Sequence, residues 1–204
     1  MSNYRDLDLK EDLSRLVDEL NLSEKVTLPD IEINLYMDQL LKFLNEKLKS
    51  FKRGEKPPLS KTMINNYTKG GLLNPPKNKK YNREHIILLI LVYNLKNILS
   101  ISDIKTLFAP ILKNMDKSEV DDNIISLEDI YSVLMELKED EYEEFKKTFN
   151  ENYTIIKEKT SNITNERNQD MAELFLTVIM LTAQANACKR MAEKIIDNYF
   201  KPKE

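Results

Sequence analysis

The sequence predicts an all-α protein. Glycine is nearly absent, with three residues in 204, while 41% of the residues are hydrophobic and 32% are charged. Leu, Ile, Lys, Glu, Asn and Met dominate the chain, a composition typical of helical proteins. Apolar residues also recur every three or four positions over most of its length, which is the spacing of one face of a helix. These observations together favour helices over strands.

Two amphipathic helices are expected in the first quarter of the chain. Leucines and one valine at helical spacing predict a helix over residues 6–20 with an acidic outer face. A longer apolar stripe from Ile33 to Phe51 predicts a second helix of about five turns. Gly54 and the pair Pro57-Pro58 disfavour helical backbone, so they end this second helix.

Two capped helices follow. Ser60 is a good N-cap for a helix over Lys61–Lys69, which a pair of glycines ends. Asn82 can cap a helix from Arg83 to about Leu99. The run Ile86–Val92 in this helix is apolar on all sides, and we therefore expect it to lie at the centre of the domain.

The next part of the chain is also expected to be helical. Residues 100–103 begin a helix that should stop near Pro110. Ser126 and the acids after it are typical of a helix start. Two apolar stripes between there and Ile156 predict two helices or one kinked helix, because the phase of the pattern slips near residues 139–141. Residues 161–168 form a polar break before the last helix.

The last helix has the most regular apolar pattern in the sequence. Its positions alternate in steps of three and four, like the a and d positions of a coiled coil. The flanking positions carry no paired charges and widen the stripe, so we interpret it as a helix packed in a bundle or as the seam of an antiparallel dimer. The predicted seam residues are Met171, Leu174, Val178, Leu181, Ala185, Cys188, Ala192, Ile195 and Tyr199. Within this stripe, Cys188 is most simply a small buried hydrophobic side chain.

Positive charge is concentrated in one window. Residues 52–83 contain nine Lys or Arg against one acid, a balance of +8, in a chain of net charge −3. All three glycines and four of the seven prolines fall in the same window. Turns and positive charge together favour a negatively charged partner, although a lysine-rich loop can also be simply solvated. Residues 116–151 have the opposite bias, with thirteen acids and four lysines. Their acidic stretch 139–144 is interpreted as a solvated face, as a mask for the basic window or as a group that repels DNA and so fixes its orientation.

The sequence carries no signature of an enzyme. It contains no Gly-rich phosphate loop, nucleophile elbow, zinc motif or matched carboxylate pair, so we expect no enzymatic activity, cofactor or metal. The only histidine, His85, lies in the first turn of an apolar helix and is interpreted as structural. The longest apolar run is seven residues, the N-terminus is charged and there is one cysteine. These features predict a cytoplasmic protein without a membrane segment.

The window from Ser60 to Phe108 resembles a known DNA-binding fold. Residues 63–75 look like the end of a recognition helix, with Tyr67 and the following Gly-Leu-Leu and Pro, and residues 77–81 stand where a basic wing would be. Residues 82–104 match the two helices that follow in that fold. The segment resembles the winged helix-turn-helix of the MerR family of bacterial transcription regulators, and the whole chain is similar to an uncharacterised bacterial family that carries it. Asn65 stands where the MerR pattern usually has arginine.

This resemblance implies specific roles on duplex DNA. A helix that begins at Ser60 presents backbone N–H groups to a phosphate, and the amides of Asn65 and Asn66 have the geometry to pair with adenine. Lysines of the window would contact phosphates, whereas Tyr67 and Tyr81 would pack the wing against the helices. The candidate DNA-binding residues are Ser60, Lys61, Asn65, Asn66, Tyr67, Lys69, Lys77, Lys79, Lys80, Tyr81 and Arg83.

The sequence therefore predicts three regions and one function. An N-terminal helical arm (1–28) precedes a MerR-like domain (29–113), and a C-terminal helical region (114–204) serves for dimerisation or effector binding. The expected function is a DNA-binding transcriptional regulator that acts on double-stranded DNA as a homodimer, with an unknown small-molecule effector. The alternative is a helical module that keeps the scaffold but binds an acidic protein, because a fold does not determine a function.

Overall fold

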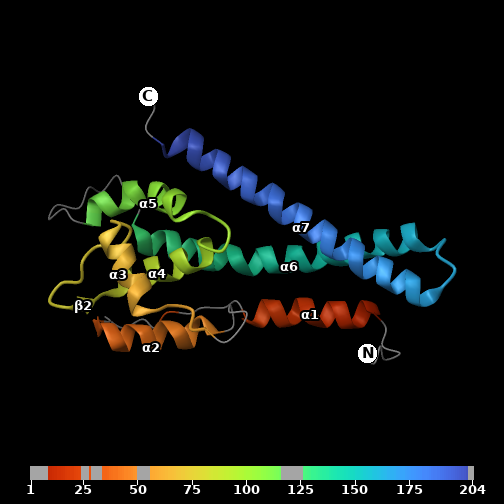
Figure 1. Cartoon of the computed structure of the whole chain (residues 1–204), viewed down its shortest axis with the longest axis horizontal. Helices are drawn as coiled ribbons and strands as arrows, with labels where there is room; N and C mark the ends of the chain where they lie inside the picture. Colours follow the sequence, from red (N-terminus) through yellow and green to blue (C-terminus); the bar gives the residue numbers. More distant parts are fainter. Residues whose placement is uncertain (1–8, 24–27, 29–33, 50–55, 116–125, 202–204) are drawn as a thin grey trace. The chain divides into compact units, whose positions relative to one another are not determined.

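The computed structural model describes residues 9–23, 28, 34–49, 56–115 and 126–201. In these ranges the chain forms seven helices and one two-stranded sheet (Figure 1), so the protein is all-α as predicted. The helices are α1 (Leu9–Ser23), α2 (Met37–Lys47), α3 (Lys61–Lys69), α4 (Arg83–Leu95), α5 (Ile101–Met115), α6 (Leu127–Thr160) and α7 (Glu166–Tyr199). The strands are β1 (Leu35–Tyr36) and β2 (Lys80–Tyr81). Some predicted features lie outside the described residues, namely Ile33, Phe51, Gly54, the charges at 52–55 and the acidic residues 116–125.

The residues group into two compact units that do not follow chain order. The first unit consists of Met1–Lys25 and Glu136–Cys188, and the second consists of Val26–Met135 and Lys189–Glu204. Both α6 and α7 contribute residues to each unit. The boundaries predicted from the sequence, after residues 28 and 113, follow chain order, and a division by chain order cannot group the C-terminal residues with a segment far upstream.

The core of the second unit is built around α4. All nine residues from His85 to Tyr93 are buried, which confirms the predicted central position of this helix. A helix that is apolar all round can be satisfied only when other elements cover every side of it. The buried side chains packed in the same cluster include Leu40 and Leu44 of α2, Ile64 and Tyr67 of α3, Ile104 and Phe108 of α5, Leu127 and Tyr131 of α6, and Ile196 of α7.

The prediction that a helix stops near Pro110 is wrong. Pro110 lies inside α5, which continues to Met115. Proline inside a helix removes one backbone hydrogen bond and costs about 3 kcal/mol. The stripe Ile104, Phe108 and Leu112 is buried on both sides of the proline, and burying one such side chain contributes about 1.5–3 kcal/mol. Packing of this stripe therefore holds the helix through the proline.

Other helix ends also differ from the predicted ones. The helix that was expected to run to about Leu99 ends at Leu95, where the N–H of Lys96 closes its last turn on the Val92 carbonyl at 2.9 Å. Residues 127–160 form one helix, which excludes the alternative of two helices and retains that of one. The phase slip in its pattern has a physical cause, because the start of α6 is buried in the second unit through Tyr131 and its later turns are buried in the first unit through Phe149.

The first unit is formed by α1 and by parts of α6 and α7. Lys146 of α6 pairs with Asp18 of α1 at 2.6 Å, and this partner raises the pKa of the lysine. The acidic residue Glu173 on α7 is only 2% exposed. It accepts hydrogen bonds from the Tyr153 hydroxyl at 2.7 Å and the Gln169 amide at 3.0 Å. A charged group can be buried at moderate cost only when it is hydrogen-bonded in this way.

We expect Tyr153→Phe to destabilise the first unit. The substitution removes the hydroxyl that donates to Glu173 and leaves one buried carboxylate oxygen without that donor, which costs about 1–3 kcal/mol. Urea unfolding followed by circular dichroism measures the change. Thr164→Val, which also removes one hydroxyl, is the control because Thr164 is exposed in the same unit, and it should not shift the midpoint. Equal midpoints for both variants would contradict a stabilising role for the Tyr153–Glu173 bond.

Candidate nucleic-acid interface

Helix α3 begins and ends where the sequence predicts. The Ser60 hydroxyl accepts a hydrogen bond from the Met63 N–H at 3.3 Å, which confirms the N-cap. At the other end Gly71 adopts a positive φ of 71°, a conformation that favours glycine. The N–H groups of Leu72 and Leu73 both donate to the Tyr67 carbonyl, at 2.9 and 3.2 Å. These bonds fold the chain back against the helix and fix the direction of the following segment.

One face of α3 is buried and the other is polar and exposed. Ile64 and Tyr67 point into the core. Lys61, Asn65 and Lys69, which are spaced four residues apart and so share one face, are exposed. Asn66 beside them is exposed as well. The predicted base-reading and phosphate-binding side chains of this helix are therefore free of the core.

Two side chains hold the segment that leads into α3, and neither role was predicted from the sequence. Asn45 of α2 donates to the Leu59 carbonyl at 3.1 Å and accepts from the Leu59 N–H at 2.9 Å. Lys96, at the end of α4, donates to the Pro58 carbonyl at 3.1 Å. Burial lowers the pKa of Lys96, whose ammonium also lies 4.4 Å from the centre of the Tyr93 ring. Their signal in the sequence is weak, because either residue could equally be solvated.

A short β-hairpin follows α3. Lys80 forms a bridge with Lys77, and its N–H donates to the Lys77 carbonyl at 3.0 Å. The two residues at the tip, Asn78 and Lys79, have φ values of 53° and 64°, as in a type I′ turn. The hairpin strand β2 pairs antiparallel with β1, in the register Leu35↔Tyr81 and Tyr36↔Lys80. This pairing places the hairpin next to the start of α2. The prediction that the second helix already includes residues 35–36 is wrong, because these residues pair with β2 and the helix begins at Met37.

Lysine is an unfavourable residue at the second tip position of this turn. A positive φ costs a residue with a Cβ about 1–2 kcal/mol, and glycine is preferred there. We therefore expect Lys79→Gly to raise the stability of the second unit by about 1 kcal/mol. Thermal unfolding measures the gain. Lys77→Gly is the control, because Lys77 is not among the residues of positive φ, and it should give no gain. A loss of stability in Lys79→Gly would show that the positive φ of Lys79 does not strain the native backbone.

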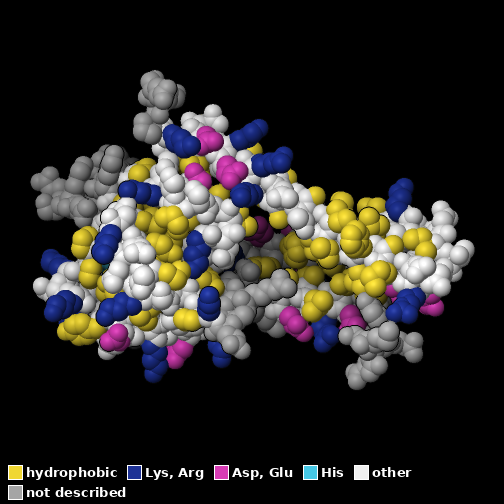
Figure 2. All heavy atoms as spheres, viewed as in Figure 1, with side chains coloured by type: hydrophobic (Ala, Val, Ile, Leu, Met, Phe, Trp, Pro, Cys, Tyr) yellow, Lys and Arg dark blue, Asp and Glu magenta, His cyan; other side chains and the backbone are white. Residues whose placement is uncertain are grey.

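The side chains of Lys77, Lys79 and Lys80 are all exposed. From residue 56 to residue 83 the chain has seven Lys or Arg and no acid. In Figure 2, Lys and Arg side chains are spread over the surface of the part that holds α3 and β2. The hairpin and α3 thus present positive charge from one continuous segment of the second unit.

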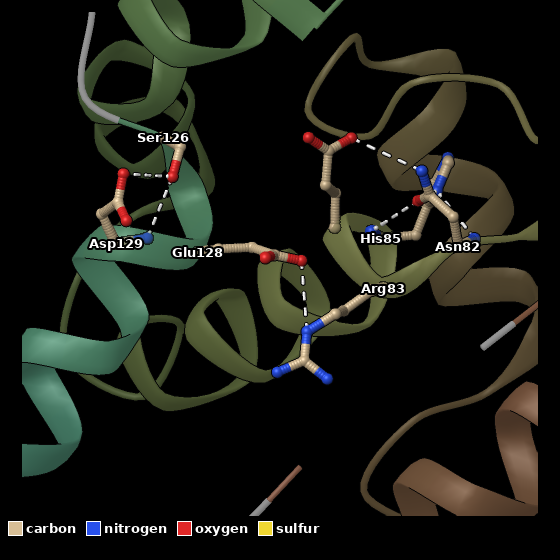
Figure 3. A network of polar contacts seen from close by, with 7 residues as sticks. Asn82, Arg83, His85, Ser126, Glu128 and Asp129 are labelled. Atoms are coloured by element: carbon tan, nitrogen blue, oxygen red, sulfur yellow. Dashed lines mark hydrogen bonds and ion pairs between the residues drawn. The ribbon is translucent and has the colours of Figure 1, made fainter. Parts of the chain in front are cut away.

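Three of the predicted DNA-binding residues, Tyr67, Tyr81 and Arg83, are buried in the protein or paired with another of its residues. Tyr67 and Tyr81 are 8% and 4% exposed, and burial raises the pKa of both hydroxyls. Arg83, in the first turn of α4, pairs with Glu128 of α6 at 3.1 Å (Figure 3). Burial also raises the pKa of the neighbouring Tyr131 to about 12, although the charge of Arg83 opposes this rise. The geometry gives these residues a positioning role.

The start of α4 carries a capping box. The Asn82 carboxamide oxygen accepts from the His85 N–H at 3.2 Å, and His85 Nδ1 accepts from the Asn82 N–H at 3.2 Å. Figure 3 shows the Asn82 side chain turned toward His85, and its amide nitrogen also lies 3.5 Å from Glu84. The start of α6 has a similar cap, in which the Ser126 hydroxyl accepts from the Asp129 N–H at 3.0 Å. Both caps were predicted.

The predicted seam on α7 is not the face that α7 buries. Six of its nine residues are exposed and the other three are half-buried. The face that packs inside the first unit instead carries Glu173 and Thr177. Figure 2 shows hydrophobic side chains gathered over this part of α7, where Phe175 is 67% and Val178 is 62% exposed. The expectation that Cys188 is buried is wrong for the single chain, because Cys188 is exposed.

By length and composition, α7 is the one helix of the described residues that could cross a membrane. Only 11% of its most apolar window is buried. Its uncharged stretch, Leu174–Cys188, has fifteen residues, which is fewer than the about 20 that a membrane span needs. One such helix is weak evidence for a membrane protein.

The candidate interface lies within a segment shared with other proteins. Residues 25–134 match a family described as Domain of unknown function (DUF1836). The chain belongs to the DUF1836 family. This match agrees with the similarity to an uncharacterised family that the sequence indicated. The DUF1836 segment contains both strands, the helices α2 to α5 and the start of α6, and so it holds the whole candidate interface. No curated protein and no solved structure matches the chain.

Proposed function

We propose that the DUF1836 segment is a MerR-like winged helix-turn-helix that binds duplex DNA, and that the protein is a transcriptional regulator. In this proposal α2 is the first helix of the motif, α3 is the recognition helix and the 77–80 hairpin is the wing. The observation that most supports this proposal is the exposed polar face of α3, followed by a hairpin with three exposed lysines. Both lie in the segment 56–83, which contains no acid. Duplex DNA is the partner that such a helix and a basic hairpin fit.

Each exposed side chain has a distinct role on the DNA. Asn65 and Asn66 would pair with base edges in the major groove, where an amide matches the donor and acceptor of adenine. Lys61, Lys69 and the hairpin lysines would contact phosphates and supply affinity without sequence information. Lys79 supports this role, because the chain keeps a cation at a backbone position that prefers glycine. Tyr67, Tyr81 and Arg83 would hold the two elements in place.

The proposed active form is a homodimer through α7. A DNA site with two-fold symmetry requires a protein with two-fold symmetry. The seam on α7 is a regular apolar stripe that the single chain leaves exposed or half-buried. Its charges also suit an antiparallel pair. The first turns of α7 have a net charge of −2, its last turns have a net charge of +1, and the stretch between them is uncharged. The charged residues are Glu166, Arg167, Asp170 and Glu173 at the first end and Lys189, Arg190, Glu193, Lys194 and Asp197 at the last. The proposal places the protein in the cytoplasm and assigns it no enzymatic activity or cofactor.

The connection between α2 and α3 favours a second candidate function. A helix-turn-helix usually joins its helices by a turn of about 3–4 residues, whereas residues 48–60 separate α2 from α3. A scaffold altered in this way could bind an acidic protein through the same lysines. The second candidate is therefore a protein interaction module without DNA binding.

Retardation of duplex DNA in a native gel tests the proposal. The purified protein is mixed at low salt with a pool of random duplexes, and recovery of bound DNA from cells that carry the tagged protein identifies the site. The proposal expects retardation that weakens as salt rises. If no duplex is retarded at low salt, the regulator proposal fails. Pull-down of protein partners without nucleic acid supports the second candidate.

A further inference from the structure

His85 holds both ends of the 77–80 hairpin. Its Nε2 lies 3.2 Å from the carbonyl oxygen of Asn74, which precedes the hairpin. Its Nδ1 accepts from the N–H of Asn82, which directly follows β2, and also contacts the Asn82 carboxamide oxygen. The ring packs edge-on against Tyr81 of the hairpin, with centroids 5.4 Å apart. One imidazole thus ties the segments before and after the hairpin to the first turn of α4.

One of these contacts requires an unprotonated Nδ1, namely the bond from the Asn82 N–H, whereas the Nε2–H bond to the Asn74 carbonyl is compatible with either charge state. With Nδ1 as an acceptor and Nε2–H as a donor, the ring satisfies the Asn82 N–H and the Asn74 carbonyl together. Protonation places a hydrogen on Nδ1, so the Asn82 N–H loses its acceptor. The standard capping box has Glu or Gln at this third helical position. Here His85 stands in that place, which makes this capping box sensitive to protonation of an imidazole.

We propose that His85 is a pH-dependent clamp, whose protonation releases the Asn82 side of the stem of the 77–80 hairpin from α4. The effect of this release on DNA affinity rests on the proposed function, whereas the release itself does not. A hairpin that loses its fixed stem presents its three lysines less precisely to phosphates. Acidification would then weaken DNA binding through loss of order in the hairpin.

The surroundings of His85 favour the neutral form. His85 is 7% exposed, and burial lowers its pKa below the ordinary value of 6.5. The carbonyls of Asn74 and Pro75 and the charge of Glu84 oppose this shift. Tyr81 is the titratable group that faces the ring from β2, and the segment before the hairpin faces it with carbonyls. Because the folded pKa is lowered, the stability from this site is present above the unfolded pKa and is lost as pH falls through the folded pKa.

Hydrogen exchange of the full chain, corrected for the intrinsic effect of pH, tests the clamp. From about pH 7.5 to about pH 4.5, a range that extends well below the ordinary histidine pKa because burial lowers the pKa of His85, the Lys80 amide should lose protection several-fold. The Leu88 amide in the middle of α4 should not. In His85→Gln both should stay protected, since glutamine can accept from Asn82 and donate to Asn74 but does not titrate. Constant protection of Lys80 in the wild type would overturn the proposal, and so would a parallel loss at Leu88, which reports unfolding of the whole unit.

The wild-type protein alone gives a second readout. His85 is the only histidine in the chain, so its ring signals in an NMR titration are unambiguous. The Asn82 and Lys80 amide shifts should follow pH with the same midpoint as the His85 ring. Hairpin amides that do not titrate with the ring would overturn the proposal. If the His85 ring and the hairpin amides titrate together but the protein binds no duplex DNA at any pH, the proposed function is wrong and the proposal of a pH-dependent clamp stands.

Discussion

Replacing Lys79 and Lys80 together by glutamate is expected to weaken binding to every duplex. Both side chains are exposed at the hairpin, so the substitutions should leave the fold intact. If each lysine contacts one phosphate, the slope of log affinity against log salt becomes shallower by about 1.8, or about 0.9 per contact. We expect affinity at low salt to fall by about tenfold or more, because charge reversal replaces attraction by repulsion. Fluorescence anisotropy of labelled duplexes over a salt series measures both quantities.

A control with the same change of net charge makes this result specific. Lys157 and Lys159 are exposed in the last turn of α6, outside the candidate interface. Their joint replacement by glutamate should leave affinity nearly unchanged. Equal losses in the two double variants would show that overall charge, and not the hairpin, determines binding. Asn65→Ala provides a contrast, because loss of a base contact should relax sequence preference without changing the salt slope.

Ala185→Glu is expected to convert the proposed dimer to a monomer. Ala185 lies in the seam of α7 and is exposed, so a glutamate there disturbs an interface between chains and not the fold of one chain. An unpaired charge buried at the centre of an apolar interface costs several kcal/mol. Light scattering should change from about twice the chain mass of 24.0 kDa to that mass itself. DNA affinity should fall with it, since a monomer contacts only one half-site.

Ala183→Glu is the matched control for this prediction. Ala183 is also exposed, and it lies two residues away on nearly the opposite side of the helix. The same substitution there should leave the dimer intact. A wild-type protein that is monomeric at micromolar concentration would refute the seam. Dissociation of the dimer by both variants to the same extent would show that α7 associates through a different face.

Local features could be predicted from the sequence because their causes are local. Ser60, Asn82 and Ser126 cap helices through side-chain hydrogen bonds that reach only three residues along the chain. Gly71 ends α3 because the backbone there needs a positive φ. The burial of α4 was visible because a run that is apolar on all sides has no stable place at a surface. The exposed lysines of the hairpin follow from its turn residues and charge.

Features that depend on distant partners could not be predicted in this way. The sequence does not show that Asn45 and Lys96 hold the segment before α3, because their partners are backbone groups at positions far along the chain. It does not show that Glu173 is buried, because its hydroxyl donor, Tyr153, is on another helix. The continuation of α5 through Pro110 needed the packing of Leu112, which outweighs the local cost.

The sequence by itself determined the helical class, the caps of α3, α4 and α6 and the basic hairpin, since each arises from residues within a few positions of one another. Only the tertiary structure decided which face of α7 is buried, how residues from separate parts of the chain form one unit, and that His85 closes the stem of the hairpin. These properties rest on contacts between side chains and backbone groups of different elements. A one-dimensional pattern records which residues have an apolar face or a hydrogen-bonding group, but not which partner satisfies it.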